Sequence, residues 1–306
     1  MTHAASLAVA LLLDAWLGEP RWLWDRLPHP AVLMGRAVGA ADRVFNHGTA
    51  RARRLKGIAV MAGLGAAAVG LGCAVSVLPG AGLIDIAAAA ILLAQRSLTD
   101  HVRAVADALR HSVEDGRHAV AQIVGRDTAG MDGPAIARAA IESAAENLSD
   151  GVVAPAFWFL IGGLPGLLLY KITNTADSMI GYRTPRHQAF GWAAARFDDL
   201  LNWAPARLTA LLIAALRPRP DLWRTIRADA PLHRSPNAGW PEAAMATRLD
   251  VALSGPRSYD GQIRDFPWVR ASGKRTIGAA EINAAVAVLW QVWRLMLAGV
   301  VLLALV

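Results

Sequence analysis

The chain has 306 residues, of which 55% are hydrophobic and 18% are charged, and its mean hydropathy is +0.34. Soluble chains average about 45–50% apolar and about 25% charged residues, so this composition favours a membrane protein. The formal net charge of +7 comes without a zinc-finger or RNA-recognition motif, which argues against nucleic acid and leaves membrane lipid or anionic small molecules as partners.

Apolar segments alternate with polar ones along the chain. The segment 57–78 has no charged residue and is long enough to cross a membrane, which takes about 20 apolar residues. Its pairs Gly63/Ala67 and Ala68/Gly72 have the small-xxx-small spacing that lets helices pack closely. The expected apolar segments are about 4–17, 57–78, 82–94, 152–170, 200–216 and 284–306, and the polar ones are 18–56, 95–151, 171–199 and 217–283.

A Pro79-Gly80 turn separates the segments 57–78 and 82–94, which we therefore expect to form an antiparallel hairpin. Basic residues directly precede the first of these two spans, and the positive-inside rule then puts the segment 18–56 in the cytoplasm. The hairpin returns the segment 95–151 to the same side. The basic residues are Arg51, Arg53, Arg54 and Lys56.

Two apolar segments contain residues that interrupt helices. The segment 152–170 includes Pro155 and Pro165, and the segment 200–216 includes Pro205. Broken helices at membrane depth are tolerated only where they face protein or a wet cavity, so these segments are candidates for re-entrant or interfacial positions. No strand-like alternation is present. The sequence predicts a single-domain, all-α, polytopic integral membrane protein with about four to five transmembrane or re-entrant helices and helical cytoplasmic segments.

The first candidate site lies on a helix expected over 133–148. Glu142, Glu146 and Asp150 are spaced four residues apart, so they share one face if the helix extends that far. No basic residue stands three or four positions after any of them to relieve their repulsion, and hard oxygen ligands suit Mg²⁺. The alternative is a solvated acidic face.

The second candidate site runs from Lys171 to Arg183, two basic residues that suit phosphate groups. Asp177 stands between them as a candidate metal ligand. The alternative is a membrane-boundary loop with snorkelling bases. A third candidate is the pair Asp198 and Asp199, which enters an apolar stretch and is therefore either functional or paired with an arginine.

Two further candidates contain prolines. The stretch Ser235-Pro-Asn-Ala-Gly-Trp-Pro-Glu242 is expected to form a rigid, exposed loop with Trp240 as a flat ligand surface, or else a plain structural turn. His29 stands between two prolines and is either a base or a structural residue. The stretch Gly273-Lys-Arg-Thr276 lacks the upstream glycine and the hydroxyl residue of a P-loop, so any nucleotide site is non-standard.

Taken together and in order, these segments resemble the CobD/CbiB family, the adenosylcobinamide-phosphate synthases. The resemblance covers nearly the whole chain, and Ala176 is a small departure within one stretch. The stretches are Asp14–Arg36 with Pro28-His29-Pro30, Glu142–Asp150 running into Gly151–Pro155, Asn174-Thr-Ala-Asp177-Ser-Met, Gly181-Tyr182-Arg183, Phe190-Gly191-Trp192, Asp198-Asp199 with Asn202, Pro205-Ala-Arg207-Leu-Thr and Ser235–Glu242.

The resemblance implies an ATP-dependent ligase of cobalamin biosynthesis. It would join adenosylcobyric acid, an adenosylated corrinoid, to (R)-1-amino-2-propanol O-phosphate, with Mg²⁺ as the expected ion. We also expect a multi-pass protein of the cell membrane, active segments in the cytoplasm, and a downstream membrane enzyme of cobalamin assembly as a neighbour.

For this reaction the candidate residues fall into three groups. Candidate Mg²⁺ ligands are Glu142, Glu146, Asp150 and Asp177. Candidates for binding ATP or the substrates are Lys171, Asn174, Arg183, Arg186, Arg196, Asn237 and Trp240. Candidate catalytic residues are Glu146, Asp198, Asp199, Glu242 and His29.

Two functions without catalysis remain as alternatives. A transporter is favoured by Asp14, Asp85 and Arg294 within apolar segments, but the few spans and long polar segments oppose it. A membrane sensor or scaffold of the AmpE type would not need the Ser235–Glu242 stretch beside acidic clusters.

Overall fold

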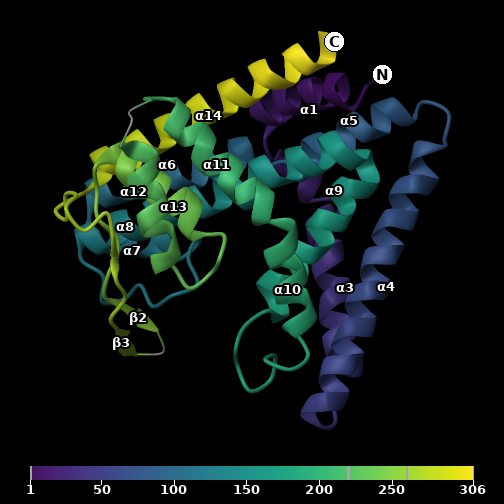
Figure 1. Cartoon of the computed structure of the whole chain (residues 1–306), viewed down its shortest axis with the longest axis horizontal. Coiled ribbons are helices and arrows are strands. Elements are labelled where there is room, and N and C mark those ends of the chain that lie inside the picture. The colour runs from purple at the N-terminus through teal and green to yellow at the C-terminus, as the bar shows by residue number, and fades with distance from the viewer. Residues whose placement is uncertain (1, 219–220, 260, 306) are drawn as a thin grey trace. The chain divides into compact units, whose positions relative to one another are not determined.

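The computed structural model describes residues 2–218, 221–259 and 261–305, and most of these residues lie in helices (Figure 1). Strands in this part of the chain are only two or three residues long, which confirms the predicted all-α class. The helices are α1 (His3–Leu17), α2 (Arg21–Trp24), α3 (Pro30–Phe45), α4 (Ala50–Ser76), α5 (Ala81–Leu92), α6 (Gln95–His111), α7 (Val113–Val120), α8 (Gly133–Leu148), the π-turn η1 (Ser149–Val153), α9 (Ala154–Ile180), α10 (Trp192–Leu201), α11 (Trp203–Ala215), α12 (Leu222–Asp229), the 3-10 turn η2 (Ala230–Leu232), α13 (Gly239–Leu249) and α14 (Ala279–Leu305). β1 (Leu253–Ser254) pairs antiparallel with β4 (Trp268–Val269), and β2 (Arg257–Tyr259) with β3 (Gln262–Arg264).

The chain divides into two compact units. The first contains Met1–Ala94, Ala154–Asn202 and Val300–Val306, and the second contains Gln95–Val153 and Trp203–Gly299. Each unit has a candidate site of its own.

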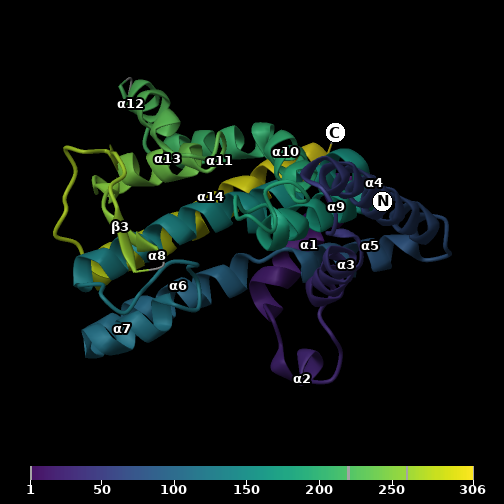
Figure 2. The same cartoon turned by 90° about the horizontal axis from the view of Figure 1, so that it is seen from below.

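In the first unit, α4 packs along α9 (Figures 1 and 2). Small residues allow the close approach, because a Cβ atom on Gly72 would collide with the backbone of Pro165 in α9. A Cβ atom on Gly57 would lie still closer to the carbonyl oxygen of Phe190, a residue that is fully buried. The expected interruption of α9 is present at Gly163, where φ is +57° and the ring of His3 occupies the space of a side chain.

In the second unit, α8 is the central helix and contacts α6, α7 and α13. It has the bounds expected from the sequence, because Asp132 accepts the N–H of Ala135 as N-cap and Pro134 occupies the first turn. Ser112 has an extended backbone that separates α6 from α7, and it caps α7 by accepting the N–H of Asp115.

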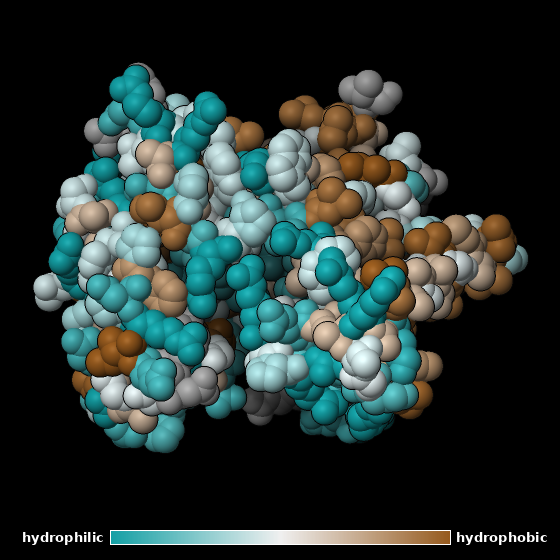
Figure 3. All heavy atoms as spheres, turned by 60° about the horizontal axis from the view of Figure 1, so that its bottom comes forward, coloured by the Kyte–Doolittle hydropathy of each residue, from teal (hydrophilic) through white to brown (hydrophobic). Residues whose placement is uncertain are grey.

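Four helical stretches are long and apolar enough to cross a membrane. They are Ala50–Ser76, Ala81–His111, Gly133–Ile180 and Ala279–Leu305, while α1 and α11 are shorter apolar helices. Figure 3 shows hydrophobic side chains gathered at the right of one face, over the end of α4 and the start of α5, where Val77, Leu78 and Leu83 are exposed. The protein is therefore a polytopic helical membrane protein, as the composition predicts.

Candidate functional site

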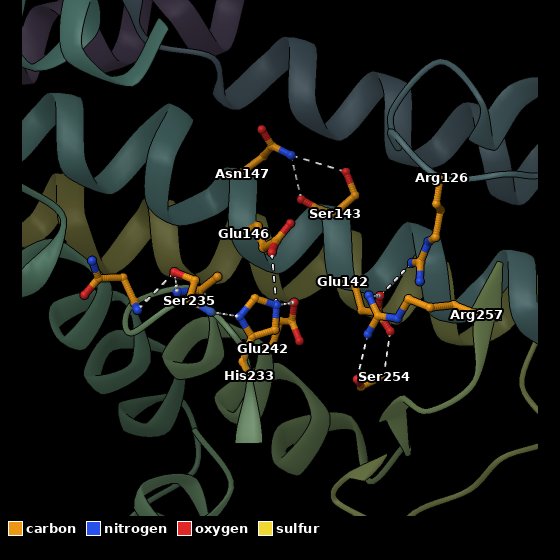
Figure 4. Close-up of polar contacts among 12 residues, drawn as sticks. Arg126, Glu142, Ser143, Glu146, Asn147, His233, Ser235, Glu242, Ser254 and Arg257 are labelled. Carbon is orange, nitrogen blue, oxygen red and sulfur yellow. Dashed lines mark hydrogen bonds and ion pairs between the residues drawn. The ribbon is translucent and has the colours of Figure 1, made fainter. Parts of the chain in front are cut away.

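Glu142 on α8 is buried at the centre of an ion-pair cluster in the second unit (Figure 4). Its carboxylate accepts a hydrogen bond from Arg126 over 2.6 Å and lies 3.3 Å from Arg257. The backbone N–H of Ser254 donates to the other carboxylate oxygen over 2.6 Å. Two guanidinium groups thus already compensate the charge of Glu142, which makes it a poor Mg²⁺ ligand and a link between α8 and the segment around β1 and β2.

One turn further along α8, Glu146 meets His233 and Glu242 (Figure 4). The Nε2 atom of His233 lies 3.8 Å from an oxygen of Glu146 and 3.5 Å from an oxygen of Glu242. The side chain of Glu242 is 1% exposed and that of Glu146 is 40% exposed, so only Glu146 is readily reached by a ligand. We call these three residues the acid–histidine cluster.

The protonation of the acid–histidine cluster follows from its surroundings. Burial, and then the nearby charges of Glu146 and Glu142, raise the pKa of Glu242 well above its usual range. Burial also lowers the pKa of His233. The Nδ1 atom of His233 accepts the backbone N–H of Ser235 over 3.0 Å, so the neutral ring carries its proton on Nε2, facing the carboxylates.

This arrangement suits proton transfer better than metal binding. A metal ion on Nε2 requires the ring proton on Nδ1, where it would face the N–H of Ser235. Mg²⁺ also prefers oxygen ligands. The acid–histidine cluster therefore fits a site that takes up and passes on a proton.

The stretch that precedes Glu242 is not the exposed loop that its composition suggests. Asn237 is buried and accepts a hydrogen bond from Arg207 over 3.1 Å. The ring of Trp240 contacts the guanidinium of Arg207 and the ring of Trp223, with centroid distances of 4.8 and 5.6 Å. These contacts fix the position of α13, so Asn237 and Trp240 orient Glu242 rather than offering a free ligand surface.

The first unit contains a second acidic site, formed by α9 and α10. Asp198 accepts hydrogen bonds from the side-chain amides of Asn202 over 3.0 Å and Asn174 over 3.3 Å. Burial raises the pKa of Asp198 to about 6, and neighbouring Asp199 adds to the shift. Asp177 lies close enough to repel both carboxylates. Carboxylates that repel one another attract a hard cation such as Mg²⁺ more than the neutralised Glu142 does. Among the described residues, however, only the acid–histidine cluster brings three ligand atoms within 4.8 Å of one another.

A cationic pocket of about 810 Å³ lies in the same unit, with Asp199 in its wall. The beginning of α4 and the segment between α9 and α10 form it, together with the first turns of α10. Its arginines are Arg51, Arg53, Arg54, Arg183 and Arg196, and its aromatic residues are Tyr182 and Trp192.

Other predicted site residues have structural partners. Arg186 pairs with buried Asp42 over 2.5 Å, which holds the segment before α10 against α3. His29 caps α3 by accepting the N–H of Ala31, and its other ring nitrogen lies 3.2 Å from the carbonyl of Ile91.

The remaining two candidates, Lys171 and Asp150, lie in different units. Lys171 is half-buried on α9. Asp150 is half-buried in the π-turn that ends the regular helical spacing after α8.

Three residues of the two glutamate clusters on α8 were not predicted from the sequence. His233 stands only two residues before the Ser235–Glu242 stretch, and this proximity was the one available signal. Arg126 and Arg257 are 16 and 115 positions from Glu142, and no local pattern predicts such partners.

The fold and these sites define a polytopic helical membrane protein with buried acid–base groups. The chain belongs to the CobD/CbiB protein family, whose model matches residues 7–289. It is similar to the cobalamin biosynthesis protein CobD of Rhizobium meliloti, with 50% identity over 93% of this chain and 91% of that protein.

The CobD protein of Sinorhizobium fredii is 48% identical over 93% of this chain and 92% of that protein. The CobD protein of Rhodobacter capsulatus is 42% identical over 95% of this chain and 100% of that protein. No solved structure matches the chain.

Proposed function

We propose that this protein is an ATP-dependent ligase that joins adenosylcobyric acid to (R)-1-amino-2-propanol O-phosphate, giving adenosylcobinamide phosphate. Membership of the CobD/CbiB family supports a role in cobalamin biosynthesis, and nearly the full length of the chain takes part in the similarity. The reaction itself is our proposal.

The chemistry requires two steps. A carboxylate is a poor electrophile, so the γ-phosphoryl group of ATP first passes to an oxygen of the free corrinoid carboxylate, releasing ADP. The amine then attacks the acyl carbon of this acyl phosphate, an amide bond forms, and inorganic phosphate leaves. The amine arrives as an ammonium ion and must lose a proton before it attacks.

The acid–histidine cluster is the observation that carries the second step. Glu146 is the accessible member and would accept the proton from the ammonium group. His233 and Glu242 would position Glu146, because the Nε2–H of His233 and the proton on Glu242 both face carboxylate oxygens. Glu242 is buried and the histidine ring is half-buried, so this side of Glu146 is shielded from water.

The first step needs positive charge around the transferring phosphoryl group. Asp177, Asp198 and Asp199 would hold Mg²⁺, which supplies such charge when it is bound. Arg183 and Arg196 face the adjoining pocket and would bind phosphate oxygens. Membrane embedding suits a product that passes to a downstream membrane enzyme, and we propose that the active segments face the cytoplasm.

The test uses the full chain, purified in detergent, with adenosylcobyric acid, aminopropanol phosphate and Mg-ATP. We expect mass spectrometry to detect the amide product only when ATP is present. Glu146→Gln should reduce its formation about 100-fold or more, which is the usual contribution of a general base. Glu114→Gln, which removes an exposed carboxylate on α7 of the same unit, is the matched control. Corrinoid uptake into proteoliposomes without amide formation would instead indicate a transporter.

A further inference from the structure

The cationic pocket of the first unit contains far more positive than negative charge. Five arginines line it, whereas Asp199 is the one carboxylate among its described lining residues. In the described part of the chain, Arg196 alone of the five forms an ion pair with a carboxylate, at 3.6 Å from Asp199. A concave surface with this excess of positive charge attracts anions.

The local structure keeps these arginines in place without neutralising them. Arg53 donates hydrogen bonds to the carbonyl oxygens of Pro185 and Arg186 over 2.8 and 2.9 Å. Arg54 lies over the ring of Trp192, 3.8 Å from its centroid. Ala50 also lines the pocket, so the free N–H groups at the beginning of α4 add to the positive potential.

We infer that this pocket binds the triphosphate of a Mg-nucleotide, with Arg54 and Arg183 on the phosphates and Trp192 or Tyr182 against the base. The inference rests on the proposed ligase function. It adds a pocket around Arg183 and Arg196, two of the residues that the sequence predicts to bind ATP without a recognised phosphate-binding motif.

Three observations favour a nucleoside triphosphate over a smaller phosphate. The volume of about 810 Å³ falls in the range of pockets for drug-sized ligands and greatly exceeds the need of aminopropanol phosphate. Two aromatic rings are available, with Tyr182 58% and Trp192 37% exposed. Asp199 of the wall lies near Asp177 and Asp198, and these carboxylates would attract the Mg²⁺ of a Mg-nucleotide.

An anionic lipid headgroup shares the phosphate chemistry and is the competing source, because the pocket borders the beginning of a candidate membrane span. A headgroup has one phosphodiester charge and no base to stack. It would use neither the aromatic rings nor the neighbouring carboxylates.

The experiment measures binding of radiolabelled Mg-ATP to the full chain in detergent by equilibrium dialysis. We expect Arg54→Gln and Arg183→Gln each to weaken binding about ten-fold or more, because each removes a charge-assisted hydrogen bond. Arg43→Gln on α3 should bind as the unchanged protein does, since Arg43 is exposed and does not line the pocket. Crosslinking with 8-azido-ATP needs no variant and should label the segment 181–196.

The other outcomes each overturn the inference. Full ATP binding by both variants, with amide product still formed, would put the nucleotide elsewhere and leave the ligase proposal standing. Loss of binding to phosphatidylglycerol nanodiscs, with ATP binding retained, would make the pocket a headgroup site. Absence of ATP binding and of ATP-dependent product in the unchanged protein would remove both the inference and the ligase proposal.

Discussion

The backbone N–H of Ser235 donates a hydrogen bond to Nδ1 of His233 over 3.0 Å. This single contact sets the neutral tautomer, with the ring proton on Nε2 and directed at Glu146 and Glu242. It therefore decides between two functions of one cluster, since a proton on Nε2 serves proton transfer and opposes a metal ion.

Replacement of His233 tests this assignment. We expect His233→Phe to lower kcat about 10- to 100-fold with little change in KM for ATP, because the polar ring that faces Glu146 from 3.8 Å is lost. His233→Gln should recover part of the rate, since its amide can donate to the same carboxylates. The pH profile of kcat should also shift in both variants, which a purely structural role would not cause.

The matched control is His118→Phe, because His118 is 79% exposed on α7 of the same unit. A tightly bound metal ion that disappears in both His233→Phe and His233→Gln, together with all activity, would contradict the proton-transfer assignment.

The raised pKa of Glu242 makes stability depend on pH. The folded protein keeps a proton on Glu242 at pH values where the unfolded chain has lost it, so stability falls as pH rises above the usual pKa of a glutamic acid, about 4.3. Glu242→Gln removes this proton and should flatten the fall. The measurement is thermal unfolding in detergent between pH 4.5 and 8, and parallel curves for the two proteins would show that Glu242 is not held protonated.

The cluster around Glu142 should be important for stability. Glu142→Gln leaves Arg126 and Arg257 with side chains only 9% and 11% exposed and no carboxylate between them, which should cost about 3–5 kcal/mol. Asp107→Asn breaks the exposed pair with Arg110 and should cost less than about 1 kcal/mol. Thermal unfolding measures both losses of stability. Equal losses for Glu142→Gln and Asp107→Asn would mean that the buried ion pair stabilises the protein no more than the exposed one.

Gly63 and Gly72 of α4 each belong to a small-xxx-small pair, yet their replacement by alanine should change stability in different ways. Gly72→Ala places a methyl group against the backbone of Pro165 and should destabilise the protein by about 1–3 kcal/mol. Gly63→Ala meets nothing within 4 Å and should be neutral or stabilising by up to about 1 kcal/mol, because alanine favours helices. Comparable melting temperatures for the two variants would exclude the close contact between α4 and α9.

The local features of the fold were predictable because their causes lie close together in the sequence. Helix α8 follows from Pro134 and an apolar pattern, and the break in α9 from Gly163 and Pro165. The hydrogen bond between Asp198 and Asn202 could be predicted for the same reason, because residues four positions apart share a helix face.

The sites were less predictable because their partners come from distant segments. Glu142 and Glu146 look alike in the sequence, yet Arg126 neutralises the first while His233 meets the second. The expected exposure of the Ser235–Glu242 stretch was wrong because Trp240 packs on Trp223 and Arg207, contacts that composition does not show.

The most direct test of the ligase proposal follows an isotope through the reaction. Adenosylcobyric acid labelled with ¹⁸O in its free carboxylate is incubated with the purified protein, aminopropanol phosphate and Mg-ATP. Because the acyl phosphate loses its bridging oxygen with the phosphate, we predict one ¹⁸O atom in the inorganic phosphate for each amide formed. Amide product with unlabelled phosphate, or no ATP-dependent amide at all, would contradict the account.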